Sequence, residues 1–157
     1  MKIYIGTDHA GFKLKEELKM FLESLGYVVE DKGAYEFNES DDYPDFIFPV
    51  VKAVAEDIAR DLDSRGIVIG GSGQGEAIVT NKVKGIRAAV VYDEYSAEMS
   101  RKHNEANILS LGTRTLTISK AKKLVQLWME TLFSNEERHK RRIEKIKAIE
   151  NNTSNMS

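Results

Sequence analysis

The chain has 157 residues, of which 31% are charged, and its formal net charge at pH 7 is −2. This length suits one domain with a sizeable core, and the charge balance disfavours general nucleic-acid binding. The absence of cysteine excludes disulfide bonds, thiolate nucleophiles and zinc–thiolate sites. The sequence shows neither a signal-peptide pattern nor an apolar run of the ~18 residues that span a bilayer. We therefore expect a soluble, cytoplasmic protein that binds neither nucleic acid nor membranes.

Short apolar runs alternate along the chain with segments of helical period. The expected strands are 2–6, 27–29, 67–69, 86–92 and 108–111, and the expected helices are 12–25, 43–62, 76–82, 96–104, 119–133 and 135–149. This alternation predicts an α/β fold, in which a five-stranded, parallel, Rossmann-like sheet carries helices on both faces. We expect residues 1–150 to form a single domain and the polar residues 151–157 to form a disordered tail.

The expected helix that begins at Tyr43 carries one apolar stripe along its length. Pro49 lies near its start, where proline is tolerated best. The stripe predicted to be buried consists of Phe46, Val50, Val51, Val54, Ile58 and Leu62.

A glycine-rich loop, residues 70–75, separates the strand 67–69 from a helix start. Glycines let the backbone approach a ligand closely, and the free N–H groups of a first helical turn bind anions. Glu76 stands where a dinucleotide fingerprint needs its last glycine after Gly73, and no P-loop lysine is present. A turn whose glycines serve geometry alone is the alternative. Because a carboxylate repels phosphate, we expect the loop to hold another oxygen while Glu76 acts on the neighbouring atom.

In open parallel sheets, ligands bind beyond the carboxyl ends of the strands. This rule groups Asp8 and His9 with the glycine loop, Asp93 and the turn 112–114. The rule therefore predicts one polar site that is assembled from distant parts of the chain.

The last expected helix is basic and has little apolar surface. Arg138 and Arg142 stand four residues apart and share one face, whereas His139 points away from that face and is expected at the surface. A solvated basic face is one interpretation. Packing against a second subunit is the other, and it explains how so polar a helix stays docked.

Several segments together resemble one family, the ribose-5-phosphate isomerase B and galactose-6-phosphate isomerase family of sugar-phosphate isomerases. The matching segments are IGTDHAGFKLK at the start, DYPDF at 42–46, GGSGQGEAIVTNKVKGIRAA at 70–89, RKHNEANILSLGTR at 101–114, and the terminal Arg138 and Arg142. The resemblance implies an open three-layer α/β/α sandwich and a homodimer or dimer of dimers with active sites at the subunit interface. It also implies interconversion of an aldose phosphate and its ketose.

The resemblance also implies catalytic roles for four residues. Asp8 and His103 would open the sugar ring, and Ser72 would pass a proton between the two sugar oxygens. Many family members carry a cysteine base at the position of Gly70, but a second branch carries a glutamate after the loop. The base is therefore assigned to Glu76, whose place at a helix start predicts an ionised carboxylate at neutral pH.

The resemblance further implies a substrate-binding set. Asn104 would hold a sugar hydroxyl, and Arg138 and Arg142 would come from the neighbouring chain to bind the phosphate. The remaining binding residues are Asp8, His9 and Arg114, with the anion hole at Gly71, Ser72, Gly73, Gln74 and Gly75.

Alternatives stay open for each of these residues. Asp8 also suits a helix N-cap, His103 an exposed helix position, and a metal held by Asp8, His9 and His103 is conceivable. We expect no metal and no other cofactor. For function, the expectation is a ribose 5-phosphate isomerase, with a six-carbon (allose or galactose) 6-phosphate isomerase or a non-catalytic sugar-phosphate binding protein as alternatives.

Overall fold

The structure, a computed structural model, describes residues 1–154 and has a five-stranded parallel sheet at its centre. The strands are β1 (Lys2–Thr7), β2 (Val28–Asp31), β3 (Ser64–Gly70), β4 (Ala88–Val90) and β5 (Ile108–Gly112). Their order is β2-β1-β3-β5-β4, and every neighbouring pair is parallel. The predicted α/β class is confirmed.

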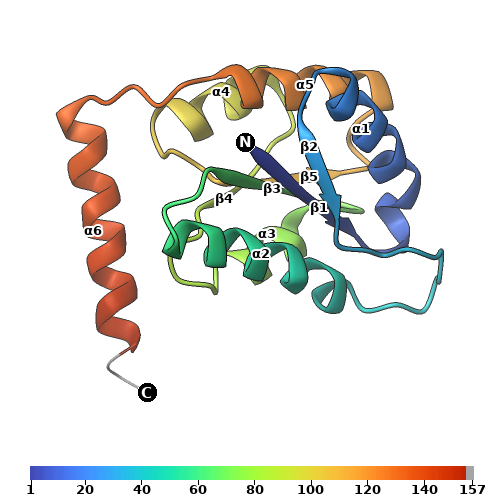
Figure 1. Ribbon diagram of the computed structural model, residues 1–157, viewed down its shortest axis with the longest axis horizontal. Helices are drawn as coiled ribbons and strands as arrows, with labels where there is room; N and C mark the ends of the chain where they lie inside the picture. The colour runs from blue at the N-terminus through green and yellow to red at the C-terminus, as the bar shows by residue number, and fades with distance from the viewer. Residues whose placement is uncertain (155–157) are drawn as a thin grey trace.

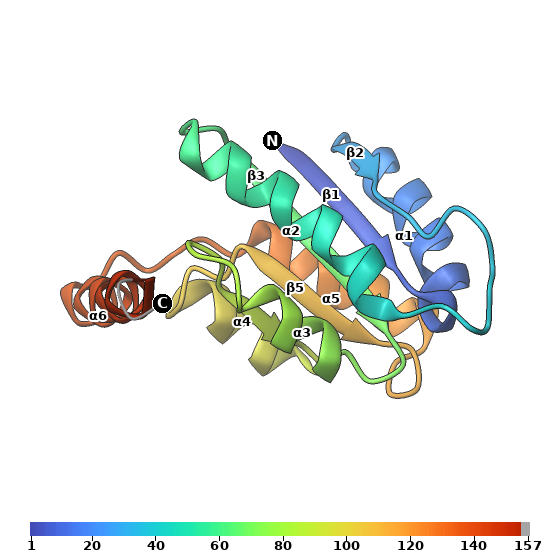
Figure 2. The ribbon, with the colours of Figure 1, turned by 90° about the horizontal axis from the view of Figure 1, so that it is seen from below.

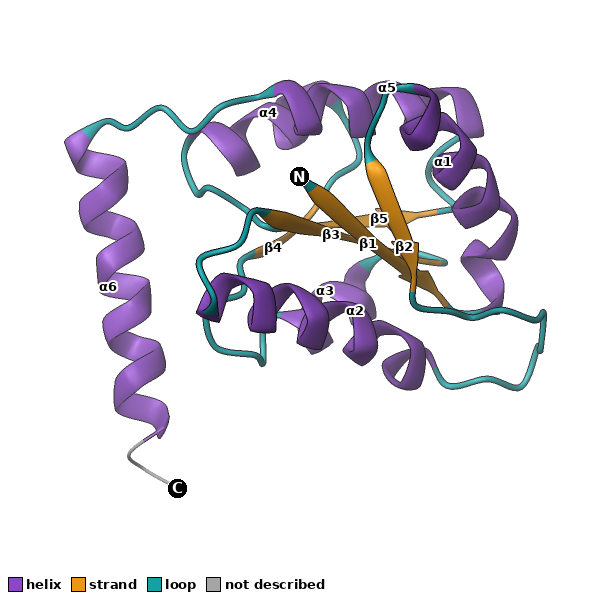
Figure 3. Cartoon of the chain, in the orientation of Figure 1, coloured by secondary structure: helices purple, strands orange, loops and turns teal. Residues whose placement is uncertain are grey.

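Helices cover both faces of this sheet, which makes three layers (Figures 1 and 3). The helical elements are η1 (His9–Gly11), α1 (Phe12–Ser24), α2 (Tyr43–Ala59), α3 (Gln74–Thr80), α4 (Glu94–Lys102), α5 (Ile118–Glu130) and α6 (Glu137–Ser154). Helices α1, α4 and α5 lie on one face, and α2 and α3 lie on the other. Within residues 1–154, no helix is both long and apolar enough to cross a membrane.

The strand β3 shows how the chain builds two hydrophobic layers at once. Ile67 and Ile69 pack into the core under α1, α4 and α5, together with the fully buried Trp128. Val68, between them, points to the opposite layer under α2. Successive side chains of a strand alternate between faces, so a continuous apolar run suits a strand that is covered on both sides.

The second helix is shorter than its apolar stripe predicted. Helix α2 ends at Ala59, and both Ile58 and Leu62 are exposed, contrary to the prediction. Ile47, which the predicted stripe omitted, is fully buried instead. The last turn of α2 extends beyond the sheet, so its apolar residues meet no layer to pack against.

Helix α6 stands apart from the three layers (Figures 1 and 2). It continues to Ser154, so residues 151–154, which we expected in a disordered tail, are helical. Residues 155–157 of that expected tail lie outside the described residues. Two side chains of α6, His139 and Ile143, are buried, and Glu150 accepts a hydrogen bond from the Gly85 amide at 3.2 Å.

The strand register brings the predicted site residues to one edge. Thr7 lies beside Ile69, and Gly70 lies beside Gly112. Asp8, the glycine loop and the turn after β5 therefore all leave the sheet at the same carboxyl edge.

Candidate active site

A cavity of about 210 Å³ lies at the carboxyl ends of β1, β3 and β5. Most of its lining comes from residues that the sequence singled out. The lining residues are Asp8, His9, Ala10, Tyr43, Gly71, Ser72, Gly75, Glu76 and Arg114. Gly73 and Gln74 belong to the same loop, as the last residue before α3 and its first residue.

The glycine loop turns from β3 into α3, and Gly71, Ser72 and Gly75 of this loop line the cavity. Gly73 has φ of +78°, a conformation that residues with a Cβ rarely adopt. The Gly73 carbonyl accepts a hydrogen bond from the Ser110 hydroxyl at 2.6 Å, which ties the loop to β5. The loop is therefore held rigidly before any ligand binds.

Gly70 leaves room for the side chain of Glu76. A Cβ placed on Gly70 would overlap the carboxylate of Glu76. The carboxylate thus fills the space that a side chain at position 70 would otherwise occupy. The position at which many family members carry the cysteine and the carboxylate of Glu76 therefore coincide in space.

Glu76 is 4% exposed, and its burial raises the pKa of its carboxyl group above the ordinary value of 4.5. The nearby negative charge of Asp8 adds to the rise, while the backbone N–H of Glu76 itself opposes it. We expected the helix start to favour the ionised form, but burial has the larger effect and the shift is upward. A general base is most effective when its pKa approaches the working pH, so this shift suits proton transfer.

Asp8 and His9 are held by local hydrogen bonds. Asp8 is the N-cap of η1, and its Oδ1 accepts from the Ala10 amide at 3.0 Å. The ring Nδ1 of His9 shares a 2.6 Å hydrogen bond with Asp41 Oδ1, and this bond raises the pKa of His9. Asp41 also accepts from the His9 amide at 2.9 Å. An imidazole paired in this way carries positive charge more readily, which suits contact with an anion.

The structure groups a different set of possible metal ligands from the one that the sequence suggested. Asp8, His9 and Asp41 each place one ligand atom within 4.8 Å of the others, and His103 is not part of this group. Within this group, His9 Nδ1 pairs with Asp41 Oδ1, whereas Asp8 Oδ1 accepts from the Ala10 amide. The expectation that no metal binds stays a prediction.

Arg114 lies in the turn after β5 and faces the glycine loop. Its amide donates to the Gly71 carbonyl at 3.0 Å. A Cβ on Gly71 would lie 3.2 Å from the Arg114 guanidinium carbon, so the guanidinium packs closely over the loop backbone. This places a fixed positive charge on one wall of the cavity.

Gly73 and Gln74 are in the loop but do not line this cavity, and four further predicted site residues lie away from it: His103, Asn104, Arg138 and Arg142. His103 and Asn104 follow α4, which runs back along the sheet, so they lie near the amino end of β5. Asn104 lines a separate cavity beside α6, and Arg138 is exposed and pairs with Glu136 at 2.7 Å. One chain therefore does not bring these four residues to the glycine loop.

His139, which we expected at the surface, is 2% exposed. Its ring stacks on that of His103 with centroids 4.3 Å apart and planes 9° from parallel. Burial, with the positive charge of His103 as the second cause, lowers the pKa of His139. As predicted, His139 is not on the face of α6 that carries Arg138 and Arg142. The face of α6 that carries His139 packs against the rest of the same chain. The surface prediction was therefore wrong.

Sequence reasoning did not single out Asp41 and gave Tyr43 no specific role. Asp41 orients His9, and the Tyr43 ring packs against Gly75, where a Cβ would lie 2.7 Å from it. Both residues belong to or adjoin the segment DYPDF at 42–46, so its acidic and aromatic composition was the available signal.

Together, the fold and the cavity define an open α/β protein with an anion loop and a buried carboxylate at the carboxyl edge of its sheet. The family model described as Ribose/Galactose Isomerase matches residues 3–146, and the chain belongs to this family.

Individual relatives agree with this assignment. Ribose-5-phosphate isomerase B of Escherichia coli (strain K12) is 42% identical over 149 residues, which cover 95% of this chain and 96% of the relative. Ribose-5-phosphate isomerase B of Clostridium thermocellum has a similar structure, with a TM-score of 0.90, 48% identity, and coverage of 98% and 99%. The Mycoplasma genitalium enzyme with bound ribulose-5-phosphate has a TM-score of 0.90, 38% identity, and 96% coverage of each chain.

The raised pKa of Glu76 predicts a pH-dependent stability difference. Its folded-state pKa exceeds 4.5, so the stability linked to this group is fully present below the unfolded pKa and is lost as pH rises through the folded pKa. The Glu76→Gln variant does not have this loss. As pH rises from the unfolded to the folded pKa of Glu76, the free energy of unfolding of the variant should therefore rise relative to that of the unmodified protein. Urea unfolding at several pH values measures the difference. A difference that stays constant from pH ~4 to pH ~8 would contradict the burial effect.

Proposed function

We propose that this protein interconverts ribose 5-phosphate and ribulose 5-phosphate, with Glu76 as the base. The observation that carries the proposal is the buried Glu76 carboxylate, which shares one cavity with the backbone of the glycine loop. The names of the relatives and the ribulose-5-phosphate bound to one of them support the five-carbon substrate over a six-carbon one. A protein that only binds sugar phosphates has no use for a buried carboxylate with a raised pKa.

The chemistry follows from the positions of these groups. Isomerisation removes the proton from the carbon beside the carbonyl and returns it to the neighbouring carbon. Glu76 takes and returns that proton, because it is a carboxylate whose pKa is raised toward neutral pH. The amides of residues 71–75 stabilise the enediolate oxygen, and loss of one such donor typically costs about 3–4 kcal/mol of barrier.

The hydroxyl of Ser72 has the freedom that a proton relay needs. Ser72 is exposed, and its Oγ accepts from the Gln74 amide at 3.3 Å, which leaves the hydroxyl proton available. Ser72 is therefore assigned to pass a proton between the two sugar oxygens. Asp8 lines the same cavity and is assigned to ring opening.

Two subunits complete the site in this proposal. His103, Asn104, Arg138 and Arg142 lie outside the cavity of their own chain, and the two arginines are exposed on the projecting helix α6 (Figure 1). A second copy of the chain would bring these residues to the glycine loop, where the arginines join His9 and Arg114 at the phosphate. The homodimer or dimer of dimers and the cytoplasmic location stay predictions.

The first test is Glu76→Gln. The amide keeps the size of the carboxylate but cannot accept the carbon-bound proton, so kcat should fall by several orders of magnitude while KM stays nearly unchanged. Steady-state kinetics with ribose 5-phosphate measures both constants. Glu98, which lies on α4 and outside the cavity, offers the matched control Glu98→Gln, which should keep normal kcat. A Glu76→Gln enzyme with more than a tenth of normal kcat would exclude Glu76 as the base.

The second test concerns the phosphate. Arg142→Ala should mainly raise KM, because the phosphate lies away from the reacting carbons and its binding is common to substrate and transition state. The adjacent Arg141 is also exposed, but it points to a different side of α6, so Arg141→Ala is the control. Equal KM values for the two variants would show that α6 does not bind the phosphate.

The third test decides whether sites are shared between chains. Mixed dimers of Glu76→Gln and His103→Asn subunits contain one site with both intact residues only if His103 acts on the neighbouring chain. Each variant alone should be nearly inactive, and co-refolding the two should restore activity. If activity does not return although mixed dimers form, His103 does not act across the interface.

A further inference from the structure

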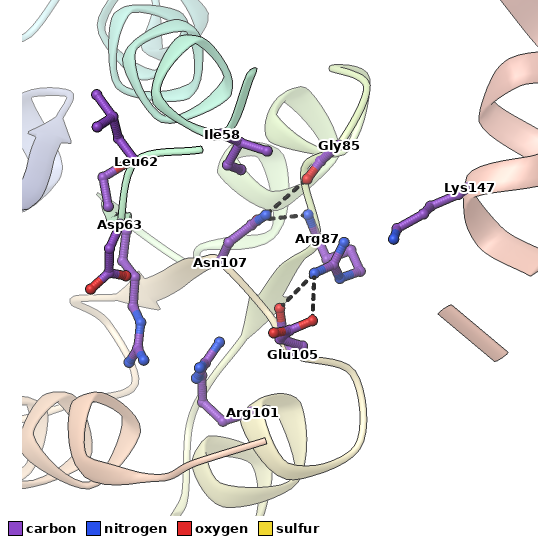
Figure 4. A pocket seen from close by; sticks show the side chains of 11 residues that line it. Ile58, Leu62, Asp63, Gly85, Arg87, Arg101, Glu105, Asn107 and Lys147 are labelled. Atoms are coloured by element: carbon purple, nitrogen blue, oxygen red, sulfur yellow. Dashed lines mark hydrogen bonds and ion pairs between the residues drawn. The ribbon is translucent and has the colours of Figure 1, made fainter. Parts of the chain in front are cut away.

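A second cavity, of about 310 Å³, lies at the opposite edge of the sheet from the glycine loop (Figure 4). It is lined by Ile58, Leu62, Asp63, Ser64, Arg65, Gly85, Arg87, Arg101, Glu105, Asn107 and Lys147. Ser64 and Arg65 begin β3, and Gly70 ends it five residues later. Five residues of strand span roughly 17 Å, so one small ligand does not reach both cavities.

The positive charges of this cavity include two buried arginines. Arg65 is 9% exposed and Arg101 is 7% exposed. Both guanidinium groups lie against the Trp128 ring, 5.3 and 5.6 Å from its centroid. Buried charges in proteins are normally paired, yet among residues 1–154 neither arginine forms an ion pair with a carboxylate.

The hydrogen bonds of Arg65 and Arg101 go only to main-chain carbonyls. Nη1 of Arg65 donates to Trp128 (3.4 Å) and Met129 (3.0 Å) at the end of α5. Arg101 donates from Nη1 to Ala106 (2.7 Å) and from Nε to Thr131 (3.4 Å). The bonds to Trp128, Met129 and Thr131 satisfy main-chain carbonyls at the C-terminal end of α5. Within the described part of the chain, Nη2 of both arginines and Nε of Arg65 have no hydrogen-bond partner.

The electrostatics of the cavity favour an added anion. Burial is the main cause that lowers the pKa of Arg101 to about 10, and the positive charge of Arg65 is the second. Burial also lowers the pKa of Arg65. Both arginines are charged at neutral pH, so two desolvated cations repel each other there, and an anion between them would relieve both costs.

The other charged residues of the lining balance one another. Lys147 of α6 points toward Arg87, which lies in the loop before β4 and is bonded to Glu105 (Figure 4), and Lys147 itself pairs with Glu144 at 2.7 Å. Because Asp63 and Glu105 offset these two cations, the excess of two positive charges in the lining belongs to the two buried arginines. A phosphate monoester carries about −1.5 to −2 at pH 7, and planar guanidinium groups match its oxygens.

A neutral group in the same lining also lacks a partner. The hydroxyl of Ser64 is buried and has no hydrogen-bond partner among the described residues. Buried polar groups without partners are rare in folded proteins, and they mark places where a ligand or water completes the bonding.

We propose that this cavity is a second anion site, which binds the phosphate group of a small phosphorylated molecule between Arg65 and Arg101. The site is separate from the glycine-loop cavity, and it does not depend on the isomerase function.

Inorganic phosphate, titrated at constant ionic strength into the full-length protein in its native assembly, tests the proposal. Amide NMR shifts distinguish the two cavities, since Gly85 and Asn107 report on the second site and Gly71 and Gly75 report on the glycine loop. We expect saturable shifts at Gly85 and Asn107. No saturable shift at these two amides overturns the proposal, whatever happens at the glycine loop.

Variants make the test specific. Arg65→Gln should weaken the phosphate affinity that Gly85 and Asn107 report by about tenfold or more, the usual effect of losing a charge-assisted hydrogen bond. Arg101→Gln should weaken it as well and decides the matter if Arg65→Gln does not fold. Arg60→Gln, an exposed position outside the cavity, is the control and should not change the affinity. Unchanged affinity in the folded Arg65 or Arg101 variant overturns the assignment.

Discussion

The contact between the Glu76 carboxylate and the backbone of Gly70 is the constraint on which the carboxyl edge of this sheet depends. With the carboxylate in this position, the end of β3 has room only for a residue without a Cβ, and the buried carboxylate lies in the first turn of the helix that follows the loop. The parallel sheet brings in the other lining residues, because its register places Asp8 and Arg114 at the same edge as the glycine loop. Burial then raises the pKa of Glu76, and a carboxylate with a raised pKa is a better base.

The charged side chains at the two edges of the sheet differ in their burial and in their hydrogen-bond partners. At the carboxyl edge, the cavity is lined by the carboxylates of Asp8 and Glu76 as well as by Arg114 and His9, and local hydrogen bonds hold His9 and Asp8 in place. At the amino edge, Arg65 and Arg101 are buried against Trp128 and held by the carbonyls at the end of α5. Buried arginines cost more to desolvate than exposed ones, so their retention needs a specific reason.

The sequence predicted the parts of this structure that local pattern controls. The alternation of strands and helices, the two-sided burial of β3 and the glycine loop all follow from periodicity and from glycine spacing. Glu76 was recognisable because a carboxylate directly after an anion loop has no structural role of its own.

Features that depend on how distant elements meet were not predictable in the same way. The burial of His139 depends on the direction that α6 takes after α5. Residues 131–136 set this direction, and the spacing of apolar residues within α6 does not reveal it. Likewise, Ile58 and Leu62 continue the apolar period of α2 beyond the edge of the sheet, so periodicity alone could not show that nothing covers them. The pairing of Asp41 with His9 joins residues 32 positions apart through a loop.

The Glu76 carboxylate beside Gly70 has a consequence for chemical resistance. A chain with glycine at 70 and no cysteine offers peroxides and alkylating agents no thiolate to attack. A cysteine introduced at position 70 would have to displace the carboxylate that fills the space there. The group that occupies this one space therefore also bears on which electrophiles the protein withstands.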